Sequence, residues 1–321
     1  MTIILKKSIL LITALAGVMA WTGCQRMEEE LVEEKPEVVK EEAPTYTLTI
    51  NAEKIPVQAG NDGASTKGLA IDGEEATTTL LKSVWKAGEQ VKVYLGADII
   101  GTLIASPDGS DAHKATLSGT VTTSGINAGI TRLTLLTPRE EWDYTGQVGK
   151  LLLTDSPTNS IEKKYHYTMA SNVLVTGVTL MSITTEDALF ANQQSIYRLS
   201  FRYKVGENRT PITAKSVTIS GASGELVQSQ VLGGATTKGP ISVTLGTASA
   251  DPFFVALRNG DETNEEVFTF TVVDENGVTY RGSKTIPAQY KPNGTFVSAK
   301  NASLDQRLDL PLSATTVDTV L

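Results

Sequence analysis

Apolar side chains alternate with threonine and other polar residues along most of this chain from residue 45 onward. In residues 45–51, for example, Tyr46, Leu48 and Ile50 alternate with threonines. A period of two places the apolar side chains on one face of an extended backbone, so each run predicts a half-buried β-strand. Further runs lie at residues 91–94, 133–136, 195–204, 217–219, 241–245, 253–257 and 267–273.

Turn residues separate these runs. Residues 274–277 (Asp, Glu, Asn, Gly) stand between two alternating runs and predict a hairpin. Gly233 and Gly234 predict another turn, because neither a helix nor a phosphate-binding Lys-Ser/Thr pair follows them in register. Helical periodicity is limited to one turn expected in residues 161–170. Many short strands with frequent turns predict an all-β chain of sandwich or barrel architecture.

The first 23 residues have the pattern of a secretory signal peptide. Lys6 and Lys7 precede an apolar run over residues 8–20, which is shorter than the roughly 20 residues that a membrane-spanning helix needs. Gly23 and Cys24 resemble the lipobox of bacterial lipoproteins, with Trp21 in place of the usual aliphatic residue. We expect Cys24, the single cysteine of the chain, to carry the lipid. The alternative is an ordinary signal peptide cut near Ala20, which leaves Cys24 as a free thiol.

Residues 24–44 are acidic and poor in large apolar side chains, which predicts a flexible tether. They contain much of the formal net charge of −8, and their acidic residues resemble the surface-export signal of some lipoproteins. About 275 residues remain, a length natural for two domains, which we place at residues 45–170 and 171–321. No basic cluster with interleaved aromatic residues is present, so nucleic acid is not an expected partner.

The sequence contains no recognisable catalytic or metal-binding constellation. It has two histidines, His113 and His166, and no G-x-S-x-G motif; we expect both histidines to be surface or packing residues. Histidine and acidic residues do not cluster at metal-ligand spacing. Residues 140–144 (Glu, Glu, Trp, Asp, Tyr) combine carboxylates with aromatics, as sugar sites do, but a solvated loop is the expected structure. We therefore expect no enzyme activity, cofactor or metal.

Several short motifs resemble the fimbrillin superfamily, the type V pilins and fimbrillin-like surface lipoproteins of Gram-negative anaerobes. Residues 83–94 resemble its W-x-x-G-D-x-[IV]-x-V strand, with Trp85 and Gly88 in place and Glu89 where Asp is commoner. Thr66 and Lys67 begin a T-[RK]-x-L element. The other similar segments are residues 115–119, Thr137 with Pro138, 216–220, 253–257 and 268–284.

This resemblance implies two tandem Greek-key (transthyretin-like) β-sandwich domains and a structural role in a surface fimbria that contributes to adhesion. It implies export as an outer-membrane lipoprotein, with other fimbrial subunits, the membrane and a surface receptor as partners. In the family, a protease removes the first strand and a strand of another subunit replaces it. Here residues 45–51 would be the removable strand, Lys54 and Lys67 flank the loop that follows, and Lys67 is the expected cut. Residues 304–321, with Leu304, Leu308, Leu310 and Leu312, would donate.

Two alternatives stay open at this stage. Residues 304–321 can instead be the last strand of their own domain, followed by a frayed tail. The protein can also be a surface lipoprotein that binds glycan or host protein and never polymerises. Removal of the first strand by proteolysis distinguishes the two functions.

Overall fold

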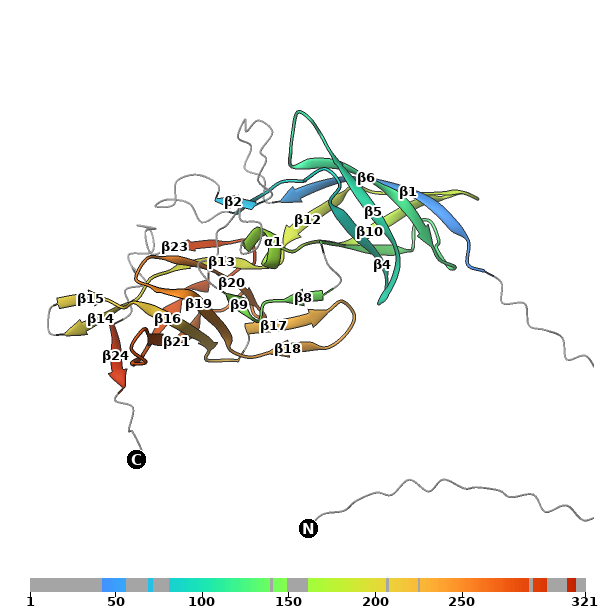
Figure 1. Cartoon of the computed structure of the whole chain (residues 1–321). Coiled ribbons are helices and arrows are strands. Elements are labelled where there is room, and N and C mark those ends of the chain that lie inside the picture. Colours follow the sequence, from blue (N-terminus) through green and yellow to red (C-terminus); the bar gives the residue numbers. More distant parts are fainter. Residues whose placement is uncertain are drawn as a thin grey trace, which may run out of the picture. The chain divides into compact units, whose positions relative to one another are not determined.

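The alternating runs form β-strands in a computed structural model of the chain. The structure describes residues 42–55, 69–71, 81–138, 141–148, 161–205, 208–224, 226–288, 291–298 and 311–315. Strands connected by turns make up nearly all of these residues, so the all-β prediction is confirmed (Figure 1). The expected helical turn is also present, as the five-residue α1 (Ile161–Tyr165). No helix in these ranges has the length and apolarity of a membrane span.

The first strand, β1, closes a barrel-like sheet, which we call the barrel sheet. β1 pairs with β6 on one side and with β12 on the other, so the order β1-β12-β10-β7-β4-β5-β6 returns to β1. β11 pairs in addition with both β1 and β10. The strands are β1 (Thr45–Ile55), β4 (Gln90–Leu95), β5 (Asp98–Pro107), β6 (Lys114–Thr122), β7 (Arg132–Thr137), β10 (Thr168–Val178), β11 (Ser182–Thr185) and β12 (Ala188–Asn192).

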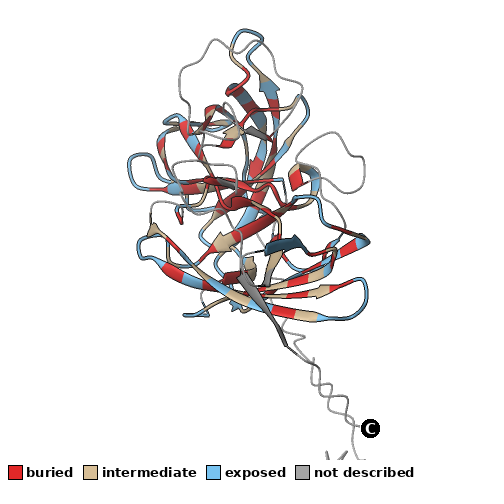
Figure 2. Cartoon of the chain, turned by 90° about the vertical axis from the view of Figure 1, so that its left-hand side faces the viewer, coloured by how far each residue is buried: buried red, intermediate tan, exposed pale blue. Residues whose placement is uncertain are grey.

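Inward-facing side chains of the barrel sheet form a core of their own. Alternate residues along β1 and β6 are buried, and Figure 2 shows buried and exposed residues interspersed along the strands. Two glycines allow β5 and β6 to lie close together: a Cβ on Gly101 would stand 2.3 Å from the carbonyl oxygen of Thr120, and one on Gly119 would stand 2.4 Å from that of Thr102. Core members include Leu48, Ile50, Trp85, Val91, Val93, Leu103, Leu117, Leu133, Leu135, Val175 and Phe190.

Apart from one separate strand pair, the other strands of the described residues form two sheets that share a second core. One sheet has the order β18-β17-β20-β13-β23 with β8 beside β17, and the other has the order β15-β14-β24-β22-β21-β16-β19-β9. Apolar residues of both sheets meet between them, among them Tyr197 and Val255 from one and Val217 and Phe270 from the other. Residues 43–321, which include both cores, form one compact unit.

The bounds of these strands follow. The six-stranded sheet contains β8 (Glu141–Asp143), β13 (Ser195–Leu199), β17 (Leu226–Val231), β18 (Thr236–Lys238), β20 (Phe253–Asn259) and β23 (Phe296–Ser298). The second eight-stranded sheet contains β9 (Gln147–Val148), β14 (Arg202–Val205), β15 (Asn208–Pro211), β16 (Ala214–Gly221), β19 (Ile241–Ser249), β21 (Glu266–Asp274), β22 (Thr279–Ile286) and β24 (Pro311–Thr315). A separate pair consists of β2 (Leu69–Ile71) and β3 (Leu81–Ser83).

Both predicted turns are present. Asp274 accepts hydrogen bonds from the backbone of Asn276 and Val278 in the β21–β22 hairpin, and Gly277 has a positive φ of 82°. Gly233 and Gly234 connect β17 to β18.

The expected pair of tandem Greek-key sandwiches is not confirmed, because pairing between β1 and β6 closes the first sheet on itself. The sheets also do not divide at residue 170. β10, β11 and β12 pair within the barrel sheet, whereas β8 and β9, which precede them, pair with β17 and β19. The chain therefore leaves the barrel sheet after β7, adds two short strands to the other sheets and returns. Pairing between strands far apart in the sequence cannot be predicted from the local composition of either strand.

Candidate functional site

Strand β1 is the element on which the sequence-based hypothesis depends. It pairs with β6 over nine positions, from Thr45 opposite Thr122 to Glu53 opposite Lys114, and in parallel with β12 over the last four residues. Its inward side chains are Leu48, Ile50, Ala52 and Lys54, all at most 4% exposed. β1 therefore fills a groove that is apolar along most of its length and holds one cation at the end.

That cation, Lys54, makes a buried ion pair with Glu89. Its Nζ lies 2.8 Å and 2.9 Å from the two carboxylate oxygens of Glu89 and donates a hydrogen bond to the carbonyl oxygen of Val84 at 3.2 Å. The same Nζ stands 4.2 Å from the ring centroid of Trp85. Lys54 is 1% exposed and the Glu89 side chain 16%. The ammonium is thus held by a carboxylate, a carbonyl and an aromatic face.

The Trp85–Glu89 motif builds the other half of this contact. Trp85 packs edge-on against Phe190 of β12, with ring centroids 4.9 Å apart. Gly88 has a positive φ of 79°, which lets the chain turn and brings Glu89 back toward the backbone N–H of Lys86 at 3.3 Å. Trp85 is 2% exposed and belongs to the core of the barrel sheet. The motif therefore anchors the end of β1 by packing and by charge.

Burial and charge act together on the ionisation of the pair. Burial lowers the pKa of Lys54, and the Glu89 carboxylate opposes this shift. Burial alone would raise the pKa of Glu89, but the charge and hydrogen bonds of Lys54 outweigh it, so the pKa of Glu89 lies below its usual value. The hydroxyl of Thr137 on β7 donates a further hydrogen bond to Glu89 at 2.9 Å. The site therefore favours a charged carboxylate facing a cation.

A second polar cluster lies next to this pair. His166 Nε2 is 2.9 Å from Ser83 Oγ and 3.1 Å from Asn192 Oδ1, and Ser83 donates a 2.6 Å hydrogen bond to the same Oδ1. The other histidine, His113, contacts the carbonyl oxygen of Ser83 through Nδ1 at 2.8 Å. Both histidines are buried packing residues, so the expectation of a packing role is confirmed and that of a surface position is not.

Sequence reasoning did not place a serine beside a histidine, because Ser83 and His166 are far apart in the chain. The contact has the distance of a nucleophile–base pair, but Ser83 is 1% exposed. An amide, Asn192, shares His166 Nε2, and no substrate reaches a hydroxyl so enclosed. The cluster is best interpreted as structural.

Substitution of His166 should make the protein less sensitive to acid. Burial, assisted by the charge of Lys54, lowers the pKa of His166 to about 4, against an ordinary value of 6.5. At a pH between 4 and 6.5, His166 is therefore protonated in the unfolded chain and neutral in the folded chain. Protonation then favours the unfolded chain, so the free energy of unfolding decreases as the pH falls from 6.5 to 4. The loss amounts to about 3 kcal/mol. Urea unfolding from pH 7 to pH 4 should show a shallower decline for His166→Gln.

Glu89 provides the control for that measurement. Its lowered pKa also removes stability in acid, below the ordinary value of 4.5. A Glu89→Gln variant should therefore keep the decline between pH 6.5 and pH 5. Equal slopes in the wild type and in His166→Gln over that interval would contradict a neutral buried His166.

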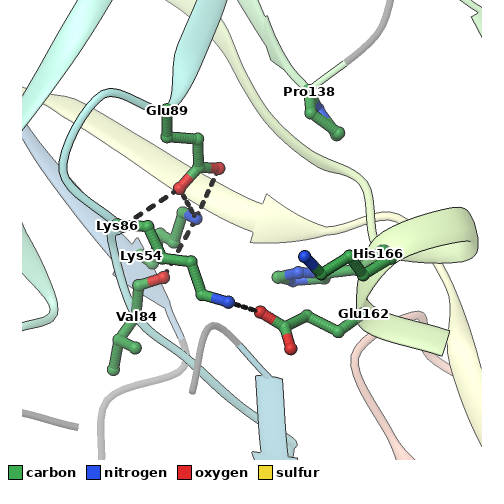
Figure 3. Close-up of a pocket in the computed structure, with 8 residues that line it drawn as sticks. Lys54, Val84, Lys86, Glu89, Pro138, Glu162 and His166 are labelled. Carbon is green, nitrogen blue, oxygen red and sulfur yellow. Dashed lines mark hydrogen bonds and ion pairs between the residues drawn. The ribbon is translucent and has the colours of Figure 1, made fainter. Parts of the chain in front are cut away.

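A small pocket opens at the edge of the ion pair (Figure 3). Its volume is about 220 Å³, and the lining combines Lys54, Glu89 and His166 with Val84, Lys86, Pro138, Glu162 and Lys163. Lys86 forms an ion pair with Glu162 of α1, and both residues are part of the lining. The lining contains three lysines and two glutamates, and the ion pairs Lys54–Glu89 and Lys86–Glu162 offset most of this charge. Among the described residues, His, Cys, Asp and Glu form no group of three that could hold a metal.

Several sequence-predicted residues lie outside the described residues. These are Cys24 and the leader 1–23, most of the tether 24–44, the expected cut at Lys67, and residues 304–310 and 316–321 of the expected donor strand. Residues 311–315 form β24, which pairs with β22 and β14. In this structure the segment is thus a strand beside its own chain.

One expectation about local sequence is wrong. Residues 141–144 are not a solvated loop, because β8 pairs with β17 and both Trp142 and Tyr144 are at most 1% exposed. Lys54, expected to flank the segment that follows the first strand, lies one residue before the end of β1, and its side chain is buried. The signal for Lys54 was present in the sequence, since it continues the period of two set by Leu48, Ile50 and Ala52.

Comparisons with known proteins add little. No family model matches the sequence, and no curated protein matches it significantly. A "putative adhesin" from Bacteroides ovatus is 11% identical over 86% of this chain and 91% of that chain, with a TM-score of 0.35. A "putative cell adhesion protein" from Bacteroides uniformis is 14% identical over 78% and 96%, with a TM-score of 0.33. Likenesses this weak establish neither fold nor function.

Proposed function

We propose that this chain is a non-catalytic structural subunit of a cell-surface fimbria, exported as a lipoprotein anchored through Cys24 and contributing to adhesion. Assembly would proceed by strand exchange: a protease cuts after Lys67, β1 leaves, and an extended strand of another subunit takes its place. The observation that supports this proposal is the position of β1. It is the first strand of the folded unit, and its departure would open the barrel sheet between β6 and β12.

The energetics favour refilling of such a groove. Without β1, one edge of β6 has no partner over nine positions, while β5 stays on its other side, and the sites of Leu48 and Ile50 are empty. Each large apolar side chain of an incoming strand would contribute about 1.5–3 kcal/mol by burial, in addition to the backbone hydrogen bonds. Donation by the chain's own last segment would require β24 to leave β22 and β14. Head-to-tail donation of this kind does not close and so builds a filament.

The experiment measures cutting first and exchange second. A chain beginning at Gln25 is treated with a Lys/Arg-specific protease, and mass spectrometry should show a new N-terminus at Gly68. A fluorescent peptide of residues 43–55 is then added, and the mixture is run unboiled on a denaturing gel. The label should migrate with the cut protein and not with intact protein. Lys67→Gln is the matched control and should neither be cut there nor take up label.

The opposite result would redirect the assignment. If the cut chain retains its own β1, excludes the peptide and stays monomeric when mixed with other fimbrial subunits, strand exchange at this groove is excluded. The protein would then be a surface lipoprotein that binds glycan or host protein without polymerising.

A further inference from the structure

The groove filled by β1 contains one feature that apolar complementarity does not require, the Glu89 carboxylate. With β1 in place, both oxygens of Glu89 contact Lys54 within 2.9 Å, and the Thr137 hydroxyl and the Lys86 backbone N–H also donate hydrogen bonds to Glu89. With β1 gone, those two neutral donors stay and the cation does not. A carboxylate so little exposed needs a counter-ion, because desolvation of an unpaired charge costs several kcal/mol.

Resting on the proposed strand exchange, we propose that Glu89 makes this groove selective for a donor strand from a different subunit that carries a lysine or arginine opposite it. The required pattern follows from β1: large apolar residues at the positions of Leu48 and Ile50, a small one at Ala52 and a cation at Lys54. The Trp85 ring and the Val84 carbonyl oxygen, which contact the Lys54 ammonium, would contact the cation of the donor strand in the same way. A neutral residue there leaves Glu89 without a partner.

The chain's own last segment shows why the donor is a different subunit. Leu310, Leu312 and Ala314 repeat the spacing of Leu48, Ile50 and Ala52, so this segment matches the apolar part of the groove. The position that corresponds to Lys54 is Thr316. A hydroxyl can accept or donate one hydrogen bond but cannot neutralise a carboxylate. The groove therefore discriminates between donors of equal apolar character by one charge.

Other ionisable groups near Glu89 already have partners. The Lys86 side chain pairs with Glu162, and His166, also in the pocket lining, lies in the hydrogen-bonded cluster with Ser83 and Asn192. Lys86 is the side chain closest in sequence that could turn toward Glu89. If it did so, the groove would accept neutral donors equally well, and the test below would show this.

The test compares labelled peptides for uptake by the protein cut at Lys67. Two peptides have the sequence of residues 43–55, one unchanged and one with Lys54→Thr; two have the sequence of residues 305–319, one unchanged and one with Thr316→Lys. In each pair the lysine peptide should bind about 100-fold more tightly, because breaking a buried ion pair costs several kcal/mol. With Glu89→Gln protein, the difference within each pair should shrink to less than about threefold.

The outcomes separate the two proposals. Uptake of all four peptides with equal affinity would overturn charge selection and leave strand exchange standing. Failure of even the unchanged 43–55 peptide to enter wild-type and Glu89→Gln protein would overturn strand exchange itself. Tighter binding of the lysine peptides to wild-type protein alone is the expected result. Because Glu89→Gln could impair folding, its thermal transition is recorded first, and Thr137→Val, which keeps the carboxylate, provides a second protein that should retain the preference.

Discussion

Replacement of Lys54 by methionine should lower the free energy of unfolding by about 3–5 kcal/mol. Methionine keeps most of the length of the side chain, so the change removes the ammonium from the 2.8 Å and 2.9 Å contacts without opening a large cavity. Glu89 is then left little exposed and without its counter-ion. Chemical denaturation followed by intrinsic fluorescence measures the loss, and Trp85, which faces the ammonium, provides a local signal.

Two control variants separate this effect from a general effect of charge. Lys114→Met removes the same charge from β6, where the side chain is 55% exposed and 3.4 Å from Asp111, and should cost less than about 1 kcal/mol. The double variant Lys54→Met with Glu89→Leu removes both charges and should recover most of the loss. A single-variant loss below 1 kcal/mol, or no recovery in the double variant, would show that the pair is not energetically coupled.

The same pair shows what the sequence could predict and where local reasoning stopped. The period of two in residues 45–51 is enough to predict a strand with one buried face, and the structure extends that strand to Ile55. Lys54 falls on the buried face by the same period, but hydropathy assigns lysine to solvent. Burial of the ammonium is possible because the turn before β4 places the Glu89 carboxylate against Lys54.

Sheet membership was beyond local reasoning for a different reason. A strand's own residues specify that it is extended and which face is apolar, but not which strand it pairs with. β10 and β12 pair with β7 and β1, although β13, only a few residues later, belongs to another sheet. The segment of Trp142 and Tyr144 was expected to be a solvated loop, because adjacency in sequence does not show which side chains face one another. Both aromatic side chains belong to the second core: β8 pairs with β17, and Arg258 of β20 lies over the Trp142 ring, and both of these strands come much later in the chain.

Residues 141–148, which we call the strap, lie between β7 and β10 of the barrel sheet and contribute β8 and β9 to the two later sheets. Gln147 donates to the carbonyl oxygen of Ala256 at 2.8 Å and accepts from its N–H at 3.1 Å. Tyr144 donates its backbone N–H to Gln228 at 2.8 Å. Trp142 supplies the largest side chain of the strap, is 1% exposed and lies 4.9 Å beneath the Arg258 guanidinium. These contacts make the strap part of the second core.

Trp142→Ala should therefore lower the free energy of unfolding by about 3–5 kcal/mol. Removal of the buried indole leaves a cavity, and the surrounding strands relax only partly to fill it. Removal of the indole also ends the cation–π contact with Arg258. Hydrogen exchange should speed up first at the Tyr144 amide and along β17, while amides between β1 and β6 keep their protection. Val148→Ala, at a strap residue 43% exposed, is the matched control and should change stability by less than about 0.5 kcal/mol.

If exchange between β1 and β6 accelerates equally in Trp142→Ala, the barrel sheet and the later sheets unfold as one unit. Release of β1 would then destabilise the whole chain rather than open one groove, so this measurement also bears on whether β1 can leave a protein that stays folded.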